Sequence, residues 1–376
     1  MQKGGNAYNL QELAGAFGDL GTLIPFVIGY ISLNGMEPAG ILIAFGLFKI
    51  WAGLYFKTPV PIQPMKAIGT AAITHAGVIT PGAIWASGLF TGVVWLVLGL
   101  TGAVTWIASI TRRPVVQGIV LGLGLGFMVE GAKMMRDDPL IALVVVPLTF
   151  VLLARPRIPA MLVLLGVGAL VAFVRDPGLP TALARVSLQL HLPTFAVSQI
   201  GWADLVSGIL VLGLPQLPLT LGNAIIATVE ENNTHFPAHP ITVKAVAVDH
   251  AALNLIGTAL GGVPMCHGAG GMAGHIRFGA RTGGALVILG GIVLFVGLFL
   301  ADSVATLFKC FPPVILGAIL FFGGLELAAG VRQSGSEKSQ RYILYLTAGL
   351  AMWNMGVGYL AGLLLAIAVE RAWIRL

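Results

Sequence analysis

Charged side chains are scarce in this sequence, and so are long polar stretches. Only 10% of the 376 residues are charged, whereas about 25% is usual in soluble domains. The chain is 57% hydrophobic and its mean hydropathy is +0.93. This composition excludes an ordinary soluble domain and predicts a polytopic membrane protein.

Cysteine is nearly absent as well. Cys266 and Cys310 both stand in apolar surroundings, so the sequence offers no disulfide framework. The N-terminus lacks a basic region followed by a compact apolar run, so we expect no secretory signal peptide. The net charge of +6 comes mostly from short loops, which is typical of membrane topology and does not indicate nucleic-acid binding.

Apolar segments recur along the whole chain and predict an all-α protein with about fourteen membrane segments. Their expected bounds are 14–33, 38–56, 64–77, 84–108, 114–132, 139–154, 158–174, 203–228, 241–260, 266–279, 284–301, 311–330, 342–353 and 355–373. Segments 64–77, 266–279 and 342–353 are too short to cross about 30 Å at 1.5 Å per residue.

Loop charges predict the orientation of the chain. With a cytoplasmic N-terminus, the cytoplasmic loops hold Lys57, Arg112, Arg113, Arg155, Arg157, Arg277, Arg281, Arg332, Lys338, Arg341, Arg371 and Arg375, and the main exceptions are Arg136, Arg175 and Arg185. This bias follows the positive-inside rule. We therefore expect a multi-pass protein of the cell (inner or plasma) membrane with both termini in the cytoplasm and residues 175–201 outside.

Two motifs occur twice in the same order. VPIQPMK begins at Val60 and VPMCHGA at Val263, an offset of 203, whereas PVVQG at Pro114 and PVILG at Pro313 are offset by 199. Because each half holds an odd number of segments, the second copy must be inverted. The sequence predicts one transporter unit, 1–376, with repeats at about 10–175 and 203–373.

The first repeated motif interrupts a membrane segment in each half. We expect an extended stretch, Thr58–Ile62 or Gly262–Met265, before a half-helix that starts near Pro64 or Cys266. Irregular backbone at membrane depth is tolerated where protein or water satisfies it, and in transporters it indicates the binding site. The two half-helix N-termini would offer N–H groups and positive dipole ends to an anion.

Polar residues in these interruptions are the candidate site. Lys66 is functional by default inside a membrane, or else it snorkels or pairs with Asp19. Gln63 is either a site amide or a helix cap. His267 either contacts the ligand or is a satisfied buried histidine, and the glycines after it allow close approach of a ligand.

A third polar interruption spans Gly213–Asn233, where two prolines predict kinks. Gln216, Thr220 and Asn223 recur near helical spacing and predict a shared face, at the ligand or as contacts between helices. Asp19 either carries a coupled proton or pairs with Lys66.

Other polar residues carry less information. His235 and His239 have the spacing of metal ligands, but Pro237 lies between them, so we expect no metal. Lys244 and Asp249 have no assignment. We expect neither a cofactor nor a catalytic residue.

Longer motifs resemble the molybdate transporter family, a branch related to the sulfate permeases. They are ELAGAFGDLGTLIPF, PVPIQPMKAIG, LPQLPLTLGNAI and GVPMCHGAGGMAGHIRFGARTGG. The resemblance implies the seven-plus-seven inverted repeat first associated with uracil permeases. It further implies a core domain at about 10–108 and 203–301, and a gate domain at about 114–175 and 311–373.

The resemblance also implies the substrate-binding residues. These are Gln63, Pro64, Met65, Lys66, Gln216, Thr220, Asn223, His267, Gly268, Ala269, Gly270 and Gly271. As in molybdate transporters, no regulatory STAS domain is expected. Asn223 stands where sulfate permeases often have an acidic residue, which leaves the proton-coupling residue open.

These features predict a secondary transporter that imports molybdate by alternating access. Tungstate and sulfate share its tetrahedral shape, so a sulfate or other oxyanion transporter is the main alternative. A nucleobase permease is less favoured because it would usually need carboxylates to read the ring. No HExxH, serine–histidine or paired-aspartate pattern favours a membrane enzyme. The expected partners are the oxyanion and the lipid bilayer, with no nucleic acid, and a homodimer is left open.

Overall fold

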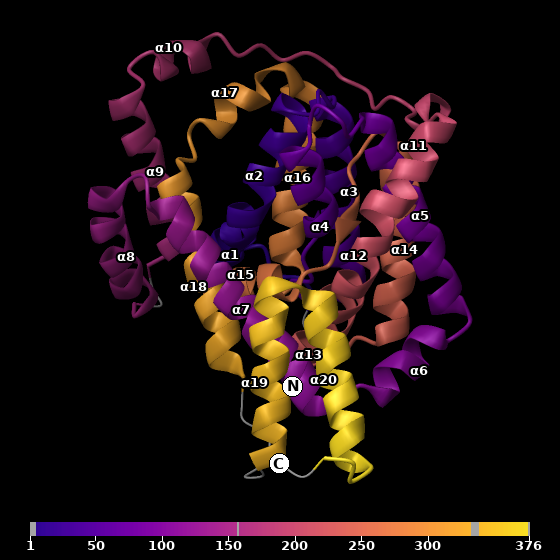
Figure 1. Cartoon of the computed structure of the whole chain (residues 1–376). Coiled ribbons are helices and arrows are strands. Elements are labelled where there is room, and N and C mark those ends of the chain that lie inside the picture. The colour runs from indigo at the N-terminus through magenta and orange to yellow at the C-terminus, as the bar shows by residue number, and fades with distance from the viewer. Residues whose placement is uncertain (1–4, 156–157, 332–337, 375–376) are drawn as a thin grey trace.

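The computed structural model describes residues 5–155, 158–331 and 338–374, and most of these residues are helical. Arg157, Arg332 and Arg375, which contribute to the loop charge bias, lie outside the described residues. Figure 1 shows long helices that run roughly parallel, with short helices between their ends.

The first half of the chain contains α1 (Leu10–Ala16), the 3₁₀ turn η1 (Phe17–Asp19), α2 (Leu20–Ser32), α3 (Pro38–Phe56), β1 (Gln63–Pro64), α4 (Lys66–Thr74), α5 (Pro81–Leu100), α6 (Ala103–Ile110), α7 (Arg113–Met135), α8 (Pro139–Leu153) and α9 (Ala160–Arg175). A short connecting helix, α10 (Leu179–Ala184), and the 3₁₀ turn η2 (Val197–Gln199) follow.

The second half contains α11 (Trp202–Ser207), η3 (Gly208–Gly213), α12 (Leu214–Leu219), η4 (Thr220–Ala227), α13 (Thr228–His235), α14 (Val243–Ala259), β2 (Met265–Cys266), α15 (Ala269–Arg277), α16 (Gly284–Phe299), η5 (Ala301–Ser303), α17 (Val304–Phe308), α18 (Pro313–Gly330), α19 (Lys338–Trp353) and α20 (Met355–Glu370). Two helices, a strand, a half-helix and a further helix thus occur in the same order in both halves.

Five helical spans among the described residues are long and apolar enough to cross a membrane, and a sixth results if α16 and α17 are joined across their 98° bend. The other described helices are shorter or less apolar than these spans. The expected count of fourteen segments therefore stays a prediction. Segment 84–108 divides into α5 and α6 because Gly102 adopts the left-handed conformation, with φ +78°.

Two groups of helices have separate apolar cores. In the first group, α3 packs along α16 and α5 packs along α14. In the second, α7 packs along α18 and α19, and α19 packs along α20. The groups meet where α15 and α2 contact α18. The first group lies in the sequence ranges predicted for the core and the second in those predicted for the gate, so they are called the core group and the gate group below. The functional division that these names imply stays a prediction.

Glycines allow the closest of these helix pairs. A Cβ atom on Gly131 of α7 would lie 2.5 Å from the carbonyl oxygen of Gly317 in α18. A Cβ atom on Gly290 of α16 would lie 2.7 Å from the carbonyl oxygen of Gly46 in α3. Small residues let helix backbones approach closely where lipid provides no hydrophobic driving force.

The two interrupted segments lie side by side. β1 and β2 pair antiparallel, with Gln63 opposite Cys266 and Pro64 opposite Met265. The backbone N–H of Met65 continues the pairing by donating to the carbonyl of Pro264 at 2.8 Å. Two strands can satisfy each other's polar groups in this way, which neither could do facing lipid.

The strands and half-helices begin later than the sequence suggests. β1 follows the expected stretch Thr58–Ile62 directly, and β2 overlaps only the end of the second stretch. The half-helices α4 and α15 start at Lys66 and Ala269 and span nine residues each. The reason is local: Met65 and Gly268 have extended backbone angles and act as N-caps, so the helices cannot start before them.

The polar segment around Gln216 forms one helical path from Trp202 to His235. Within it η3 and η4 are π-helical, on either side of the two prolines. The proposed proline kinks are thus accommodated by wider turns. A π-helical turn accommodates the helix hydrogen bonds that proline cannot make, and such turns are frequent at functional sites.

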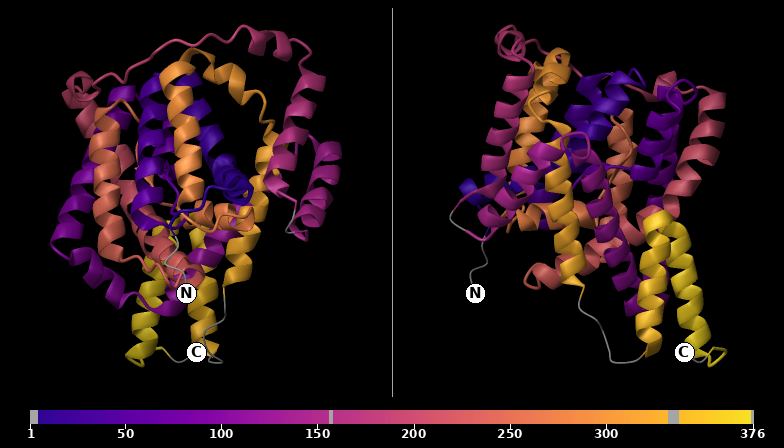
Figure 2. Two further views of the ribbon diagram at one scale, coloured as in Figure 1. Left: turned by 180° about the vertical axis from the view of Figure 1, so that it is seen from behind. Right: turned by 60° about the vertical axis from the view of Figure 1, so that its left-hand side comes forward.

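The connection between the halves crosses one end of the molecule. Figures 1 and 2 show residues 176–201 at the end opposite the hairpin of α19 and α20. The backbone N–H groups of Gln189 and His191 donate to the carbonyls of Phe299 and Leu298, at 3.0 and 2.7 Å. These bonds satisfy carbonyls at the end of α16 that have no partner within the helix.

Candidate functional site

A buried polar cluster surrounds the side chain of Gln63 in β1. Its Nε2 atom donates to Oδ1 of Asp19 and to Oγ1 of Thr22, the latter at 2.8 Å. Thr22 also donates to the Asp19 carboxylate. All three side chains are buried. The helix turns into a 3₁₀ conformation at Asp19, which brings this carboxylate to the cluster.

The start of α15 closes on this cluster. A Cβ atom on Gly268 would overlap with Oε1 of Gln63, and one on Gly271 would lie 2.5 Å from Nε2 of Gln63 and 2.9 Å from Oδ1 of Asp19. Gly268 thus has to be glycine for the backbone to lie against the amide. The N–H groups of Ala269 and Gly270 precede the first hydrogen bonds within α15, as at any helix start.

Lys66, three residues after Gln63, is the charged residue closest in sequence to the amide of the polar cluster. Its Nζ atom is buried, has no hydrogen-bond partner in the described part of the chain, and lies 3.8 Å from the centre of the Phe127 ring in α7. The proposed ion pair with Asp19 is not formed, because the Asp19 carboxylate is hydrogen-bonded to Gln63 and Thr22 instead. An aromatic ring attracts an ammonium group but does not neutralise it. Lys66 therefore has no hydrogen-bonded counter-ion among the described residues.

Gln216, held by Thr220, caps the start of α4, the first half-helix. Oε1 of Gln216 accepts hydrogen bonds from the backbone N–H groups of Ala67, at 2.9 Å, and Ile68, at 3.4 Å. Nε2 of Gln216 donates to Oγ1 of Thr220 at 3.0 Å. Two N–H groups at the start of α4 are thus occupied by a side chain. The two half-helices, expected to act alike, differ: the start of α4 is capped.

The remaining candidates divide between the site and its surroundings. Asn223 is buried, and its Nδ2 atom would lie 3.8 Å from a Cβ atom on Gly268. Ala269 and Gly270 face the gate group, where a Cβ atom on Gly270 would overlap with the Phe127 ring. The side chain of Met65 points away, since its sulfur lies 4.0 Å from the Thr91 hydroxyl of α5.

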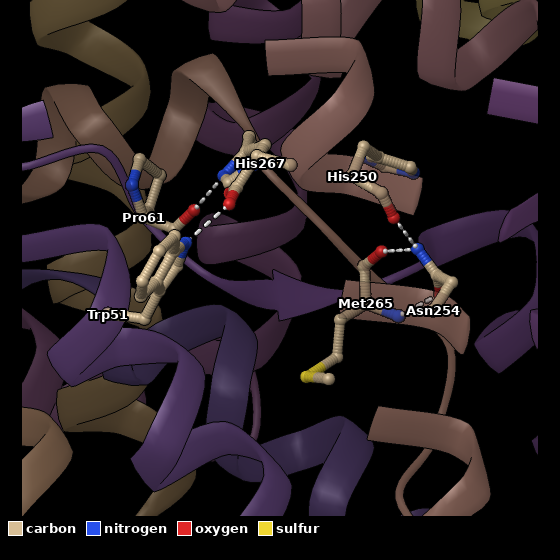
Figure 3. Close-up of polar contacts among 7 residues, drawn as sticks. Trp51, Pro61, His250, Asn254, Met265 and His267 are labelled. Atoms are coloured by element: carbon tan, nitrogen blue, oxygen red, sulfur yellow. Dashed lines mark hydrogen bonds and ion pairs between the residues drawn. The ribbon is translucent and has the colours of Figure 1, made fainter. Parts of the chain in front are cut away.

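His267 does not turn toward Gln63. Its Nδ1 atom lies 3.0 Å from the carbonyl oxygen of Pro61, and its Nε2 atom lies 2.9 Å from Oδ2 of Asp249 in α14. Oδ1 of Asp249 accepts a hydrogen bond of 2.7 Å from the Trp51 indole. Figure 3 shows His267 beside Pro61 and Trp51. Of the two alternatives from the sequence, this geometry fits a buried histidine held by protein groups, with a hydrogen-bond contact at Nδ1 and an ion-pair contact at Nε2.

Asn254 of α14 fixes β2, a role that sequence reasoning missed. Its Nδ2 atom donates to the carbonyls of Met265 and His250, both at 2.8 Å, and its Oδ1 accepts from the Met265 N–H at 2.9 Å (Figure 3). The side-chain amide thus pairs with both backbone groups of Met265 as a neighbouring strand would. Sequence pattern carries no signal for this contact.

Three further residues of the site were not foreseen. Lys49 of α3 is fully buried and donates to the carbonyl of Ile62 at 2.6 Å. A lysine within an apolar run could have indicated it. Thr22 could have been found because it lies three residues after Asp19, on the same helix face. Phe127 gives no sequence signal, since it is one of many aromatic residues in apolar helices.

A small cavity lies between the polar cluster and the gate group. It is lined by Gly18, Asp19, Gly21, Thr22, Phe127, Gly270, Ile319, Leu320 and Gly323. Its volume of about 10 Å³ is close to that of one water molecule. A tetrahedral oxyanion needs more room, so α7 and α18 have to move from α15 and α2 before such an anion can reach the cluster.

Comparisons with solved structures identify the fold. The transmembrane domain of the cyanobacterial bicarbonate transporter BicA matches with a TM-score of 0.60 at 15% identity, over 95% of this chain and 97% of that domain. The murine anion transporter Slc26a9 in its inward-facing state matches with a TM-score of 0.58 at 13% identity, over 98% of this chain and 69% of that one. The architecture is therefore that of these transporters, at a level of identity that shows fold alone.

Sequence comparisons identify the family. The chain is 32% identical to molybdate transporter 2 of Arabidopsis thaliana, over 96% of this chain and 87% of that protein. It is 28% identical to molybdate transporter 1 of Chlamydomonas reinhardtii, over 95% and 91%. Residues 11–127 and 208–327 match the family described as molybdate transporter of the MFS superfamily. Although that description names the MFS superfamily, the fold is the one shared with BicA and Slc26a9. On these matches, the chain belongs to the molybdate transporter family.

Proposed function

We propose that this protein imports molybdate across the cell membrane by alternating access. The observation that supports this best is the buried ammonium group of Lys66, which has neither a hydrogen-bond partner nor an ion-pair partner among the residues that the structure describes. A buried charge without a counter-ion is costly. A transported anion would supply the missing counter-charge during each cycle.

The surroundings of Lys66 suit a tetrahedral oxyanion. The start of α15 offers backbone N–H groups and the positive end of a helix dipole. Asn223 adds an amide group that can turn to donate, and glycines leave the backbone accessible. A doubly charged anion gains more from this field than a singly charged one, which favours molybdate, tungstate or sulfate over a halide.

The small size of the cavity supports the proposed movement between the two helix groups. In the proposed cycle, the core group carries the anion past the gate group of α7, α18, α19 and α20. Phe127 has to leave Gly270 and Lys66 when the site opens. The proposed orientation keeps both termini in the cytoplasm, as the loop charges predict.

Asp19 is the proposed proton carrier. Its Oδ1 atom accepts two hydrogen bonds, whereas its Oδ2 atom is buried and has no hydrogen-bond partner within residues 5–155, 158–331 and 338–374. A dianion in the adjoining cavity would repel a carboxylate and favour its protonated form. Entry of the anion would therefore bring a proton to Asp19, and release of the anion would allow the proton to leave.

Binding to the purified protein tests the substrate. We expect titration calorimetry to give tighter binding of molybdate and tungstate than of sulfate. Sulfate binding that equals or exceeds molybdate binding would move the assignment to sulfate transport, the second candidate. Uptake of molybdate into proteoliposomes would then test transport itself.

Proton coupling has its own measurement. An inward proton gradient should accelerate molybdate uptake by the wild type. Asp19→Asn keeps the size of the side chain and an oxygen that can accept hydrogen bonds, but it cannot take up or release a proton. Molybdate uptake by this variant should therefore no longer respond to the gradient. If Asp19→Asn responds like the wild type, the proton is carried elsewhere.

A further inference from the structure

The two ring nitrogens of His267 both face acceptors. The carbonyl oxygen of Pro61 can only accept, so Nδ1 carries a hydrogen toward it at 3.0 Å. Nε2 faces a carboxylate oxygen of Asp249 at 2.9 Å. This contact has the distance of an ion pair without the alignment of a hydrogen bond, and it places the two buried side chains directly against each other. The imidazole is thereby fixed from both sides.

This contact links segments that are far apart in sequence. Pro61 precedes β1 in the first repeat, and His267 follows β2 in the second. Asp249 lies in α14, and its second oxygen is held by the indole N–H of Trp51 in α3 at 2.7 Å. The His267 and Asp249 side chains are 0% and 4% exposed. At such burial, solvent does not compete for the contact.

The position of His267 in the chain makes the contact relevant to the anion site. Cys266 pairs with Gln63 across the sheet, and Gly268 lies against the Gln63 amide. Because side chains alternate along extended backbone, His267 points to the other side and holds the strand from behind. The residues directly after it carry the N–H groups that start α15.

We propose that Asp249 is a positioning residue for the anion site and acts through His267. Asp249 and Trp51 hold the imidazole, the imidazole holds Pro61 and the start of α15, and the N–H groups of α15 are thereby kept in place for the oxyanion. This inference rests on the proposed function. Asp249 itself does not touch the site, because its carboxylate is used by His267 and Trp51.

Two substitutions of Asp249 separate position from charge. Asp249→Ala releases His267, so the KM for molybdate uptake should rise about tenfold while the maximal rate per folded transporter stays within about twofold. Asp249→Asn can still accept from Trp51 and can donate to Nε2 of a neutral His267. It should therefore restore a nearly wild-type KM. A wild-type KM in Asp249→Ala, or an Asn variant as impaired as the Ala variant, would overturn the proposal.

His250→Ala is the matched control. His250 is buried in the same helix, packs edge-on against His267 with ring centres 6.0 Å apart, and neither of its ring nitrogens has a partner in the part of the chain described. Truncating His250 leaves a similar void but keeps the contact between His267 and Asp249, so the KM for molybdate uptake should stay at the wild-type value. If KM rises equally in His250→Ala, the raised KM of Asp249→Ala reflects a general loosening of the core, and the proposal is refuted.

A second variant covers the case in which Asp249→Ala does not fold. His267→Gln with Asp249→Asn removes both ionisable groups, so no unpaired charge is left buried. Because glutamine cannot reach residue 249 and Pro61 together, the double variant should fold and still show the raised KM. A folded double variant with a wild-type KM would contradict the inference.

Failure of the proposed function is recognised in the wild type. If the wild type takes up sulfate rather than molybdate, the substrate assignment fails, and the same variants are compared for sulfate KM with the same two outcomes. A wild type that takes up neither molybdate, tungstate nor sulfate overturns the function and the inference together.

Discussion

Lys66 of the first half-helix and Phe127 of α7 are joined by a contact of 3.8 Å between the ammonium nitrogen and the ring centre. A cation from the core group is thus covered by an aromatic ring from the gate group. Such contacts contribute about 0.5–2 kcal/mol, which is weak enough to be exchanged for a contact with an anion. Substrate binding and movement of the gate group are therefore expected to be coupled at this pair.

Lys66→Ala should weaken anion binding far more than folding. A charge-assisted hydrogen bond to a partly desolvated dianion is worth about 1.5–3 kcal/mol, or roughly a ten- to hundredfold loss in affinity. Lys66→Arg should not rescue binding fully, because the larger guanidinium has to fit against Phe127. Calorimetry on monodisperse protein provides the measurement, with the exposed Lys309→Ala as control. Normal molybdate binding by Lys66→Ala would make Lys66 structural.

Gly270→Ala should impair uptake by pushing against Phe127. The added Cβ atom would overlap with the Phe127 ring. Truncating that ring in the double variant Gly270→Ala/Phe127→Ala should return part of the rate, because the space is then available. Gly291→Ala in α16 is the control, since nothing lies within 4 Å of its Cβ position. Wild-type uptake by Gly270→Ala alone would show that the contact does not limit transport.

Larger side chains at the start of α15 should impair uptake more strongly than alanine does. Gly268→Val and Gly270→Val should abolish uptake, since both added side chains fill space that Gln63 or Phe127 occupies. Folding is checked separately by size-exclusion profile and thermal stability. Transport by a folded Gly268→Val protein would place the anion elsewhere.

Arg277 at the end of α15 and Glu326 in α18 form an ion pair of 3.2 Å between the two helix groups. Both side chains are partly exposed, so the pair is worth about 0.2–1 kcal/mol. Arg277→Glu and Glu326→Arg should each change the uptake rate severalfold at most and leave molybdate affinity nearly unchanged. The double charge reversal should restore the wild-type rate. Additive effects in the double variant would show that the two residues act independently.

The orientation in the membrane is tested by labelling with an impermeant thiol reagent in a Cys310→Ser background. Ser187→Cys in the outer connection should react in intact cells, whereas Tyr8→Cys and Arg371→Cys should react only after permeabilisation. All three positions are exposed in the fold. Labelling at both terminal positions but not at Ser187 in intact cells would reverse the topology.

Much of the candidate site could be predicted because polar residues stand out clearly within the apolar segments of a membrane protein. Lys66, Gln63 and the glycines around Gly270 interrupt apolar segments, and the doubled Val-Pro motif indicated that the two interruptions belong together. The pairing of Gln63 with Cys266 agrees with that expectation. The ligand roles of these residues stay predictions until binding is measured.

Partners of buried side chains could not be predicted. Whether Asp19 pairs with Lys66 or with Gln63 depends on atomic distances between helices, and only the folded chain sets them. Gln216 appeared as a ligand candidate, whereas its amide caps α4. Asp249 and His267 lie 18 positions apart in the chain, and neither shows from its sequence neighbours that the other holds it.

The sequence by itself determined the class, the family and the location of the interruptions, because hydropathy, motif order and intramembrane charge are properties of the chain read along its length. The tertiary structure alone decided which half-helix start is capped, which way His267 points and which gate residue covers Lys66. Those outcomes follow from close packing, where a shift of about one turn of a helix exchanges one hydrogen-bond partner for another.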